Sequence, residues 1–285
     1  MSGSTIAPSL VSDFQKDGAV FLKGIFGDWV DTLQAGLDRN LREPSPTARY
    51  HKGDGEASFF NDYCNWDRIP EYRSFIYDSP AAGVVARLTG SGHVRLFHEH
   101  VVLKEAGNAV ETPWHHDQPY YGINGKKTCS LWVALDHVQR NIAVEYIAGS
   151  HAWGKMFTPM FFSGKPVSQN PEWQDMPDID GNRDDYRILG WEAHPGDAIA
   201  FNFRTVHGAP ANTSLSRRAA IAFRWFGDDV TYADRAGDTS PPFPNLKLKE
   251  GDAMDAPEFP LIWHHNIAST GSAGVTGQNK EINDV

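Results

Sequence analysis

From His93 onward the chain is a series of short extended runs separated by turn residues, and this pattern restricts the fold more than any other feature of the sequence. Turn signals such as Pro195-Gly196-Asp197 separate these runs. Many short strands with turns between them are typical of an antiparallel sandwich or barrel. We therefore expect a mainly β fold with strands within His93–Lys104, Thr128–Asp136, Val144–Ile147, Ile188–Ala193, Ala198–Arg204 and Arg218–Phe226.

The first hundred residues have a mainly helical pattern instead. Apolar residues recur at helical spacing from Val30 to Leu41 behind a capping Asp28, which predicts one helix. A second helix is expected between Ser79 and Gly90, because a proline follows its first residue and the glycine suits its end. The β core should therefore carry flanking helices.

Three segments lack a clear period. Residues 49–66 are rich in glycine, aromatic and charged residues and are predicted to form a loop that covers a site. Pro159–Tyr186 is predicted to be an excursion over the surface, and Asn266–Val285 a loosely ordered tail. No repeat or linker divides the sequence. We predict one domain over residues 1–285, with a helical part at about 8–92, a strand-rich core at about 93–230 and a C-terminal extension and tail at about 231–285.

Composition narrows the possible partners. The 285-residue chain has 40% hydrophobic residues and a formal net charge of −10, so it can bury a core but offers no attractive field to nucleic acid or an anionic membrane. Two cysteines cannot build a disulfide framework and fit a reducing compartment. The sequence has neither a secretory signal pattern nor an apolar run of membrane-spanning length. We expect a cytoplasmic protein with a small-molecule substrate.

The segment Thr112–Tyr121 carries the strongest chemical signal. His115 and Asp117 are two residues apart, so on an extended strand both side chains leave the same face. An imidazole and a carboxylate are two of the three ligands in the two-histidine, one-carboxylate site of non-haem Fe(II). His207 is the best candidate for the third ligand. Three ligands leave positions open for chemistry, although these ligand types would also suit Mn or Zn.

Arg218 supplies a second, independent signal. On an extended strand it shares a face with Ala220 and Ala222, while the opposite face is apolar. An arginine beside two alanines leaves a cavity with a fixed cation at its base. A guanidinium binds a carboxylate through two parallel hydrogen bonds, so this cavity suits a dicarboxylate ligand.

These motifs together resemble the phytanoyl-CoA dioxygenase (PhyH) family of Fe(II)/2-oxoglutarate-dependent oxygenases. The resemblance extends from Phe14 to about Phe226 and depends on Trp114-His115-His116-Asp117, Gly149-Ser150-His151, Pro195-Gly196-Asp197, His207-Gly208 and Arg218. It implies a double-stranded β-helix, which is a cupin-like jelly roll with helices packed on one sheet. It also implies the cofactor Fe(II), the cosubstrate 2-oxoglutarate and O2.

The resemblance assigns roles to individual residues. His115, Asp117 and His207 would bind the iron, and Arg218 would pair with the distal carboxylate of 2-oxoglutarate. Lys104 matches a family lysine near the cosubstrate, and Trp132 matches a tryptophan that lines the same pocket. Thr128 shares a strand face with Trp132 and is predicted to belong to this pocket as well.

Two positions depart from the family pattern. Ala209 stands where the family often has a hydroxyl that contacts the cosubstrate, so that contact is lost or supplied elsewhere. Arg140-Asn141-Ile142-Ala143 stands where the family usually has an Asn-Gly turn. Because isoleucine is poorly suited to a left-handed turn position, we expect this turn to be reshaped.

The resemblance implies hydroxylation of an aliphatic carbon, with release of succinate and CO2. Halogenases of this superfamily replace the carboxylate ligand with a small residue, whereas this chain keeps Asp117. Desaturation, epoxidation or ring closure on the same scaffold stays open, as do a non-catalytic cupin-like metal-binding protein and a zinc-dependent hydrolase or isomerase. The chain has no basic cluster for a CoA thioester, which favours a small polar metabolite or a natural-product intermediate as substrate.

Substrate contacts are harder to predict. Candidate pocket residues are Trp114, Tyr120, Tyr121 and Phe203. Six residues of strand separate Arg224 from Arg218, or roughly 20 Å at 3.3 Å per residue, so we expect Arg224 to form a surface salt bridge far from the iron. His116 faces away from its neighbours and is expected behind the ligands or in solvent.

Overall fold

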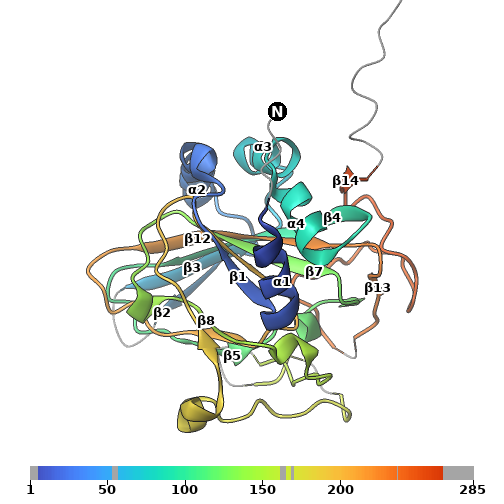
Figure 1. Cartoon of the computed structure of the whole chain (residues 1–285). Coiled ribbons are helices and arrows are strands. Elements are labelled where there is room, and N and C mark those ends of the chain that lie inside the picture. The colour runs from blue at the N-terminus through green and yellow to red at the C-terminus, as the bar shows by residue number, and fades with distance from the viewer. Residues whose placement is uncertain (1–5, 53–56, 161–164, 168–169, 236, 266–285) are drawn as a thin grey trace, which may run out of the picture.

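Two antiparallel sheets lie over one another in the computed structural model, which describes residues 6–52, 57–160, 165–167, 170–235 and 237–265 (Figure 1). The larger sheet has the strand order β1-β10-β7-β12-β4-β3-β2, and β14 also pairs with β4. Its strands are β1 Ala19–Leu22, β2 Arg49–Lys52, β3 Ser58–Tyr63, β4 His93–Lys104, β7 Thr128–Ala134, β10 Ala198–Phe201, β12 Arg218–Phe226 and β14 Leu261–His264.

The smaller sheet has the order β5-β11-β8-β9 and supplies the opposite wall. Its strands are β5 Thr112–His115, β8 Glu145–Ile147, β9 Ile188–Leu189 and β11 His207–Ala209. A separate pair joins β6 Ile123–Asn124 to β13 Thr231–Tyr232. This arrangement is the jelly roll expected from the sequence. The predicted strands β4 and β12 have identical observed bounds, whereas the run Ile188–Ala193 is extended only at Ile188–Leu189.

Four helices cover the outer face of the larger sheet (Figure 1). They are α1 Pro8–Asp17, α2 Val30–Arg42, α3 Pro70–Asp78 and α4 Ala81–Thr89. The alternation of β12 explains why they pack there, since Ile221, Phe223 and Trp225 point into the helix-covered core. Ala220 and Ala222 point instead into the space between the two sheets. The two predicted faces of this strand are therefore confirmed.

The predicted loop at residues 49–66 is wrong in its described part. Arg49–Lys52 and Ser58–Tyr63 are paired strands, and β3 extends the larger sheet by pairing with β4. The alternation of β3 was hidden because both of its faces are buried, with Phe59 and Phe60 each less than 5% exposed. Strand β3 forms part of the wall of the cavity described below, because Phe59, Asn61 and Tyr63 line it.

Two other expectations concern the C-terminal half. Pro159–Tyr186 is more than a surface excursion, because its described residues Met160, Met176 and Ile179 line the cavity. The predicted loose tail, Asn266–Val285, lies outside the described residues. Of the helices in the described part of the chain, none has the length and apolar character needed to cross a membrane.

Candidate metal and cosubstrate site

A cavity of about 570 Å³ lies between the two sheets. The larger sheet contributes side chains from β3, β4, β7, β10 and β12, and the smaller sheet contributes residues of β5, β8 and β11. Most of the lining is aromatic or aliphatic. The polar exceptions include His115, Asp117, His207, Arg218 and Arg224, so the two strongest sequence signals meet in one cavity.

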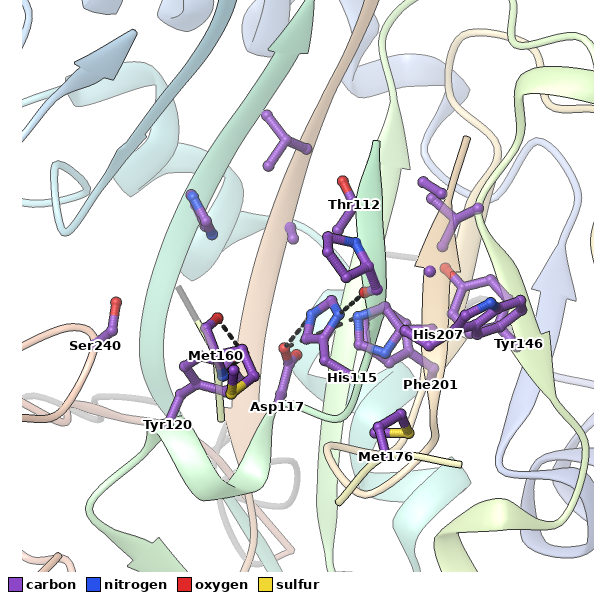
Figure 2. Close-up of a pocket in the computed structure, with 18 of the residues that line it drawn as sticks. Thr112, His115, Asp117, Tyr120, Tyr146, Met160, Met176, Phe201, His207 and Ser240 are labelled. Atoms are coloured by element: carbon purple, nitrogen blue, oxygen red, sulfur yellow. Dashed lines mark hydrogen bonds and ion pairs between the residues drawn. The ribbon is translucent and has the colours of Figure 1, made fainter. Parts of the chain in front are cut away.

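His115, Asp117 and His207 converge at the wall of this cavity, and their side chains point toward one another (Figure 2). Their possible ligand atoms all lie within 4.8 Å of one another. Asp117 Oδ1 is 3.7 Å from His115 Nε2 and 3.9 Å from His207 Nε2. The pairing of β5 with β11 causes this convergence, because it places His115 directly opposite His207. The predicted group of three ligands is thus present in the fold.

Both imidazoles present Nε2 to this centre. His115 Nδ1 lies 2.8 Å from the Pro113 carbonyl oxygen, and His207 Nδ1 lies 2.9 Å from that of Thr205. A carbonyl oxygen only accepts hydrogen bonds, so each Nδ1 carries the hydrogen and each Nε2 keeps its lone pair. Burial lowers the pKa of His207 to about 3, which keeps its ring neutral. Neutral imidazoles with fixed tautomers are the form that binds a metal ion.

Asp117 reaches the site by a different route from the one expected. Strand β5 ends at His115, and Asp117 has helical backbone angles of φ −72° and ψ −35° at the start of a 3-10 turn. Asp117 is therefore close to His115, as predicted, but the two residues do not share the face of a strand. Burial alone would raise the pKa of Asp117, but the positive charge of Arg224 holds it below its usual value. Asp117 is consequently a carboxylate, as a metal ligand must be.

The Gly149-Ser150-His151 motif fixes the start of β11. Ser150 Oγ donates to the Ile147 carbonyl at 2.7 Å and accepts from the Val206 backbone N–H at 2.8 Å. These two bonds hold the residue before His207 against the end of β8. Gly208 allows the next close approach, because a Cβ there would lie 3.1 Å from Trp114 and 3.2 Å from a backbone oxygen. Local packing thus explains why a serine and a glycine stand at these positions.

Arg218 lies in the same cavity and is buried. One of its Nη atoms donates to the carbonyl oxygen of Ile142. Burial lowers the pKa of Arg218 to about 10, so the group stays cationic near neutral pH. The residues described around it include no carboxylate within ion-pair distance. A buried cation without a partner anion is a ready binding point for an anionic ligand.

The segment Arg140–Ile142 stands where the family usually has an Asn-Gly turn. It forms a short 3-10 segment, and Ile142 is not among the residues with left-handed backbone angles. Its side chain is buried and its carbonyl oxygen contacts Arg218. Ala209 faces the cavity without a polar atom of its own.

Other predicted pocket residues divide into two groups. Trp132, Trp114, Tyr120 and Tyr121 line the cavity, whereas Lys104, Thr128 and Phe203 do not. The ammonium of Lys104 donates to the Val110 and Pro210 carbonyl oxygens at 2.6 and 3.3 Å. It lies next to Arg218 across the β4–β12 pair and is not among the residues that line the cavity. The Thr128 hydroxyl accepts from the Phe203 backbone N–H, and Phe203 packs in a buried aromatic cluster.

His116 lies behind the ligands, as expected, and is buried rather than in solvent. Its Nε2 accepts a hydrogen bond from the Phe157 backbone N–H at 3.0 Å. Burial lowers the pKa of His116 to about 4, which keeps this nitrogen able to accept. The ring therefore connects the ligand segment to the chain that follows β8.

The expectation for Arg224 is wrong. It is buried, lines the cavity, and its Nε lies 3.5 Å from Asp117 Oδ2. Arg224 lies toward the other end of β12 from Arg218, and Asp117 approaches β12 at the end that carries Arg224. Distance along one strand does not show where a turn from the other sheet will cross it.

Sequence reasoning also missed polar cavity residues on the neighbouring strands. Tyr146 of β8 lies beside His207, with ring centroids 5.7 Å apart, and Figure 2 shows it near Phe201 on one side of the metal ligands. Its buried hydroxyl has no hydrogen-bond partner within the described structure. His98 and His100 of β4 line the cavity near Arg224. The alternation of His98, His100 and Val102 along β4 could have predicted that these side chains share the face that lines the cavity.

Comparison with known proteins agrees with this geometry. The sequence profile of a family described as Phytanoyl-CoA dioxygenase (PhyH) matches residues 14–220. No curated protein sequence matches the chain significantly.

Several solved structures share the fold. The carbocyclase SnoK from nogalamycin biosynthesis, described as non-heme and alpha-ketoglutarate-dependent, superposes with a TM-score of 0.72 at 21% identity, over 92% of this chain and 99% of SnoK. The epimerase SnoN, in complex with Fe3+, alpha-ketoglutarate and nogalamycin RO, gives 0.71 at 22% identity, over 90% and 98%. EctD from S. alaskensis, with 2-oxoglutarate and 5-hydroxyectoine, gives 0.65 at 18% identity, over 89% and 87%.

Proposed function

Because the chain belongs to the phytanoyl-CoA dioxygenase family, we propose that it is an Fe(II)- and 2-oxoglutarate-dependent dioxygenase that oxidises a small molecule. The observation that carries this proposal is the presence, in one cavity, of a His-Asp-His ligand group and a buried arginine without a partner anion. A metal-storage site needs no such arginine. A cosubstrate with a free carboxylate needs a buried cation of this kind to bind it.

The donor set fits the metal. His115, Asp117 and His207 would bind Fe(II) through two neutral imidazoles and one carboxylate, which leaves positions open. When bound, the iron would supply the activation of O2 that is coupled to decarboxylation of 2-oxoglutarate to succinate and CO2. The protein's own contribution is to orient the ligands and to keep the site dry.

The chain also offers contacts for 2-oxoglutarate. Arg218 would pair with its distal carboxylate, and Trp132 would form part of the wall around its carbon chain. The free hydroxyl of Tyr146 is buried in the same lining and would donate to an oxygen of this ligand. Such a bond would replace the contact that Ala209 cannot make. Lys104 would act only indirectly, through its position beside Arg218.

The substrate would occupy the other side of the ligands. Tyr120, Met160 and Ser240 lie there, beyond Asp117 in the view of Figure 2. Described residues of the Pro159–Tyr186 segment and of strand β3 also line the cavity, which would help to exclude water from a reactive centre. We propose hydroxylation of an aliphatic carbon as the reaction and the cytoplasm as the location.

The test begins with binding. Under anaerobic conditions, Fe(II) together with 2-oxoglutarate should produce the weak visible charge-transfer band of the chelated cosubstrate, and His207→Ala should abolish it. Metal bound in normal amount without this band would instead favour a non-catalytic binding protein. Turnover that proceeds without O2 would favour a hydrolase or isomerase.

The mass of the product distinguishes hydroxylation from the alternative reactions. The structural neighbours include a carbocyclase and an epimerase, so ring closure and epimerisation are specific alternatives. A metabolite library would be screened for succinate release, and the products would be weighed. Hydroxylation adds one oxygen, ring closure or desaturation removes two hydrogens, and epimerisation leaves the mass unchanged. A product without added oxygen would contradict the hydroxylase assignment.

A further inference from the structure

The two oxygens of Asp117 face different partners. Oδ1 is the oxygen nearest to both imidazoles, at 3.7 Å from His115 Nε2 and 3.9 Å from His207 Nε2. Oδ2 faces the opposite way and lies 3.5 Å from Arg224 Nε. The carboxylate is therefore divided between a metal-facing oxygen and an arginine-facing oxygen.

Arg224 lies on a central strand of the larger sheet, and this strand is paired on both sides. It lies on β12 between its two neighbouring strands, opposite His98 of β4 and Ser130 of β7. Asp117 is 4% exposed and Arg224 is 7% exposed, so water screens the attraction between them poorly. The guanidinium has two further partners. They are the Ala222 carbonyl, 3.4 Å from Nη1, and the Tyr121 side chain, whose hydroxyl also interacts with it and whose ring lies 5.8 Å away.

Asp117 is the carboxylate that Arg224 meets among the described residues, and the nearby His98 and His100 are held neutral by burial. We infer that Arg224 is a positioning residue that retains Asp117 Oδ2, so that Asp117 offers a metal ion only Oδ1. It acts through Asp117 and not on the substrate. An anionic substrate would therefore compete with Asp117 for this guanidinium.

One-oxygen binding matters for the number of free positions. If Asp117 bound a metal ion through both oxygens, it would occupy a second coordination position, which a bidentate ligand would then lack. The consequence for 2-oxoglutarate rests on the proposed function, whereas the consequence for metal binding does not. Residues that orient metal ligands typically change metal affinity ten- to a hundredfold when they are removed.

The experiment loads the metal-free full chain with Co(II), whose visible d–d spectrum reports the ligand set. Arg224→Met removes the cation while keeping a side chain of similar length. We expect the Co(II) dissociation constant to rise about ten- to a hundredfold and the d–d spectrum to change. Arg217→Met is the matched control, because Arg217 pairs with Asp136 at 2.9 Å outside the cavity. It should leave both measurements unchanged.

A second variant protects the test against misfolding. Arg224→Lys keeps the charge but not the position of Nε, and it should weaken Co(II) binding less than Arg224→Met does, with an altered spectrum. Folded variants that bind Co(II) with wild-type affinity and spectrum would overturn the inference. The wild-type protein separates this result from the proposed function, since Co(II) binding without the Fe(II)–2-oxoglutarate band would reject only the oxygenase.

Discussion

Arg218 and Arg224 lie on the same face of one strand and in the same cavity, yet their surroundings differ. Arg224 is near the carboxylate of Asp117, whereas the described surroundings of Arg218 supply a backbone carbonyl, aromatic groups and the neighbouring Lys104. The alanines beside Arg218 predicted a cavity around this arginine. The sequence could not predict the contact between Arg224 and Asp117, because Asp117 lies in a turn whose path no strand pattern specifies.

Arg218→Met should separate cosubstrate binding from metal binding. Hydrogen bonds to charged groups contribute about 1.5–3 kcal/mol, so the 2-oxoglutarate dissociation constant should rise about ten- to a hundredfold. The Co(II) dissociation constant should stay near the wild-type value, because Arg218 contacts none of the three ligands in the described structure. Titration of the charge-transfer band measures the first quantity. Unchanged 2-oxoglutarate affinity would contradict the role given to Arg218.

Lys104 should make stability depend on pH. Burial, followed by the charge of Arg218, lowers the pKa of Lys104 to about 7, while an unfolded lysine titrates near 10.4. Between these values the unfolded chain binds more protons, so folding stability rises with pH, by up to about 1.4 kcal/mol per unit. From pH 7.5 to 9 the wild-type free energy of unfolding should gain up to about 2 kcal/mol relative to Lys104→Met. Urea denaturation of both proteins measures this, and parallel pH profiles would refute it.

At the scale of elements, regular amphipathic segments were predictable and short ones were not. Strands β4 and β12 and helices α2 and α4 follow from the apolar period, and Gly90 ends α4 as predicted. The predicted cap Asp28 is wrong, because it lies in a 3-10 turn and α2 has no side-chain cap at its N-terminus. The β2–β3 hairpin was missed because a strand buried on both faces has no alternation. β9 and β11 are only two and three residues long, too short for any period, and their extended backbone depends on pairing with neighbours.

Ser150→Ala tests how β11 is held. The substitution removes the hydroxyl that joins Ile147 to Val206 and leaves a buried backbone N–H without its acceptor. Leaving such a group unpaired costs about 1–3 kcal/mol, so the free energy of unfolding should fall by that amount. Co(II) binding should weaken as well, because His207 follows this contact. Ser74→Ala is the control, since Ser74 bonds to Asp78 on the surface and should change stability by less than about 0.5 kcal/mol. Equal effects of the two substitutions would contradict this account.

At the scale of the whole molecule, the site exists only because the two sheets enclose it. His115 and His207 are far apart in sequence and meet through the pairing of β5 with β11. Spacing in the sequence pairs His115 with Asp117, whereas no spacing rule connects either of them to His207. A metal ion held by all three residues therefore binds the folded chain and has no comparable site in the unfolded one.

Metal binding should accordingly raise the thermal stability. At a free Co(II) concentration one hundred times the dissociation constant, the folded state gains about 2.7 kcal/mol, which corresponds to a rise in Tm of roughly 4–5 °C for a chain of this size. His207→Ala should lose the rise. The structure offers a matched control in the exposed group of His137, Glu192 and His194, which could also attract a metal ion. His194→Ala should keep the full rise in a differential scanning calorimetry experiment. If His194→Ala abolished the shift and His207→Ala kept it, the stabilising ion would be bound at the surface and the cavity would not be the metal centre.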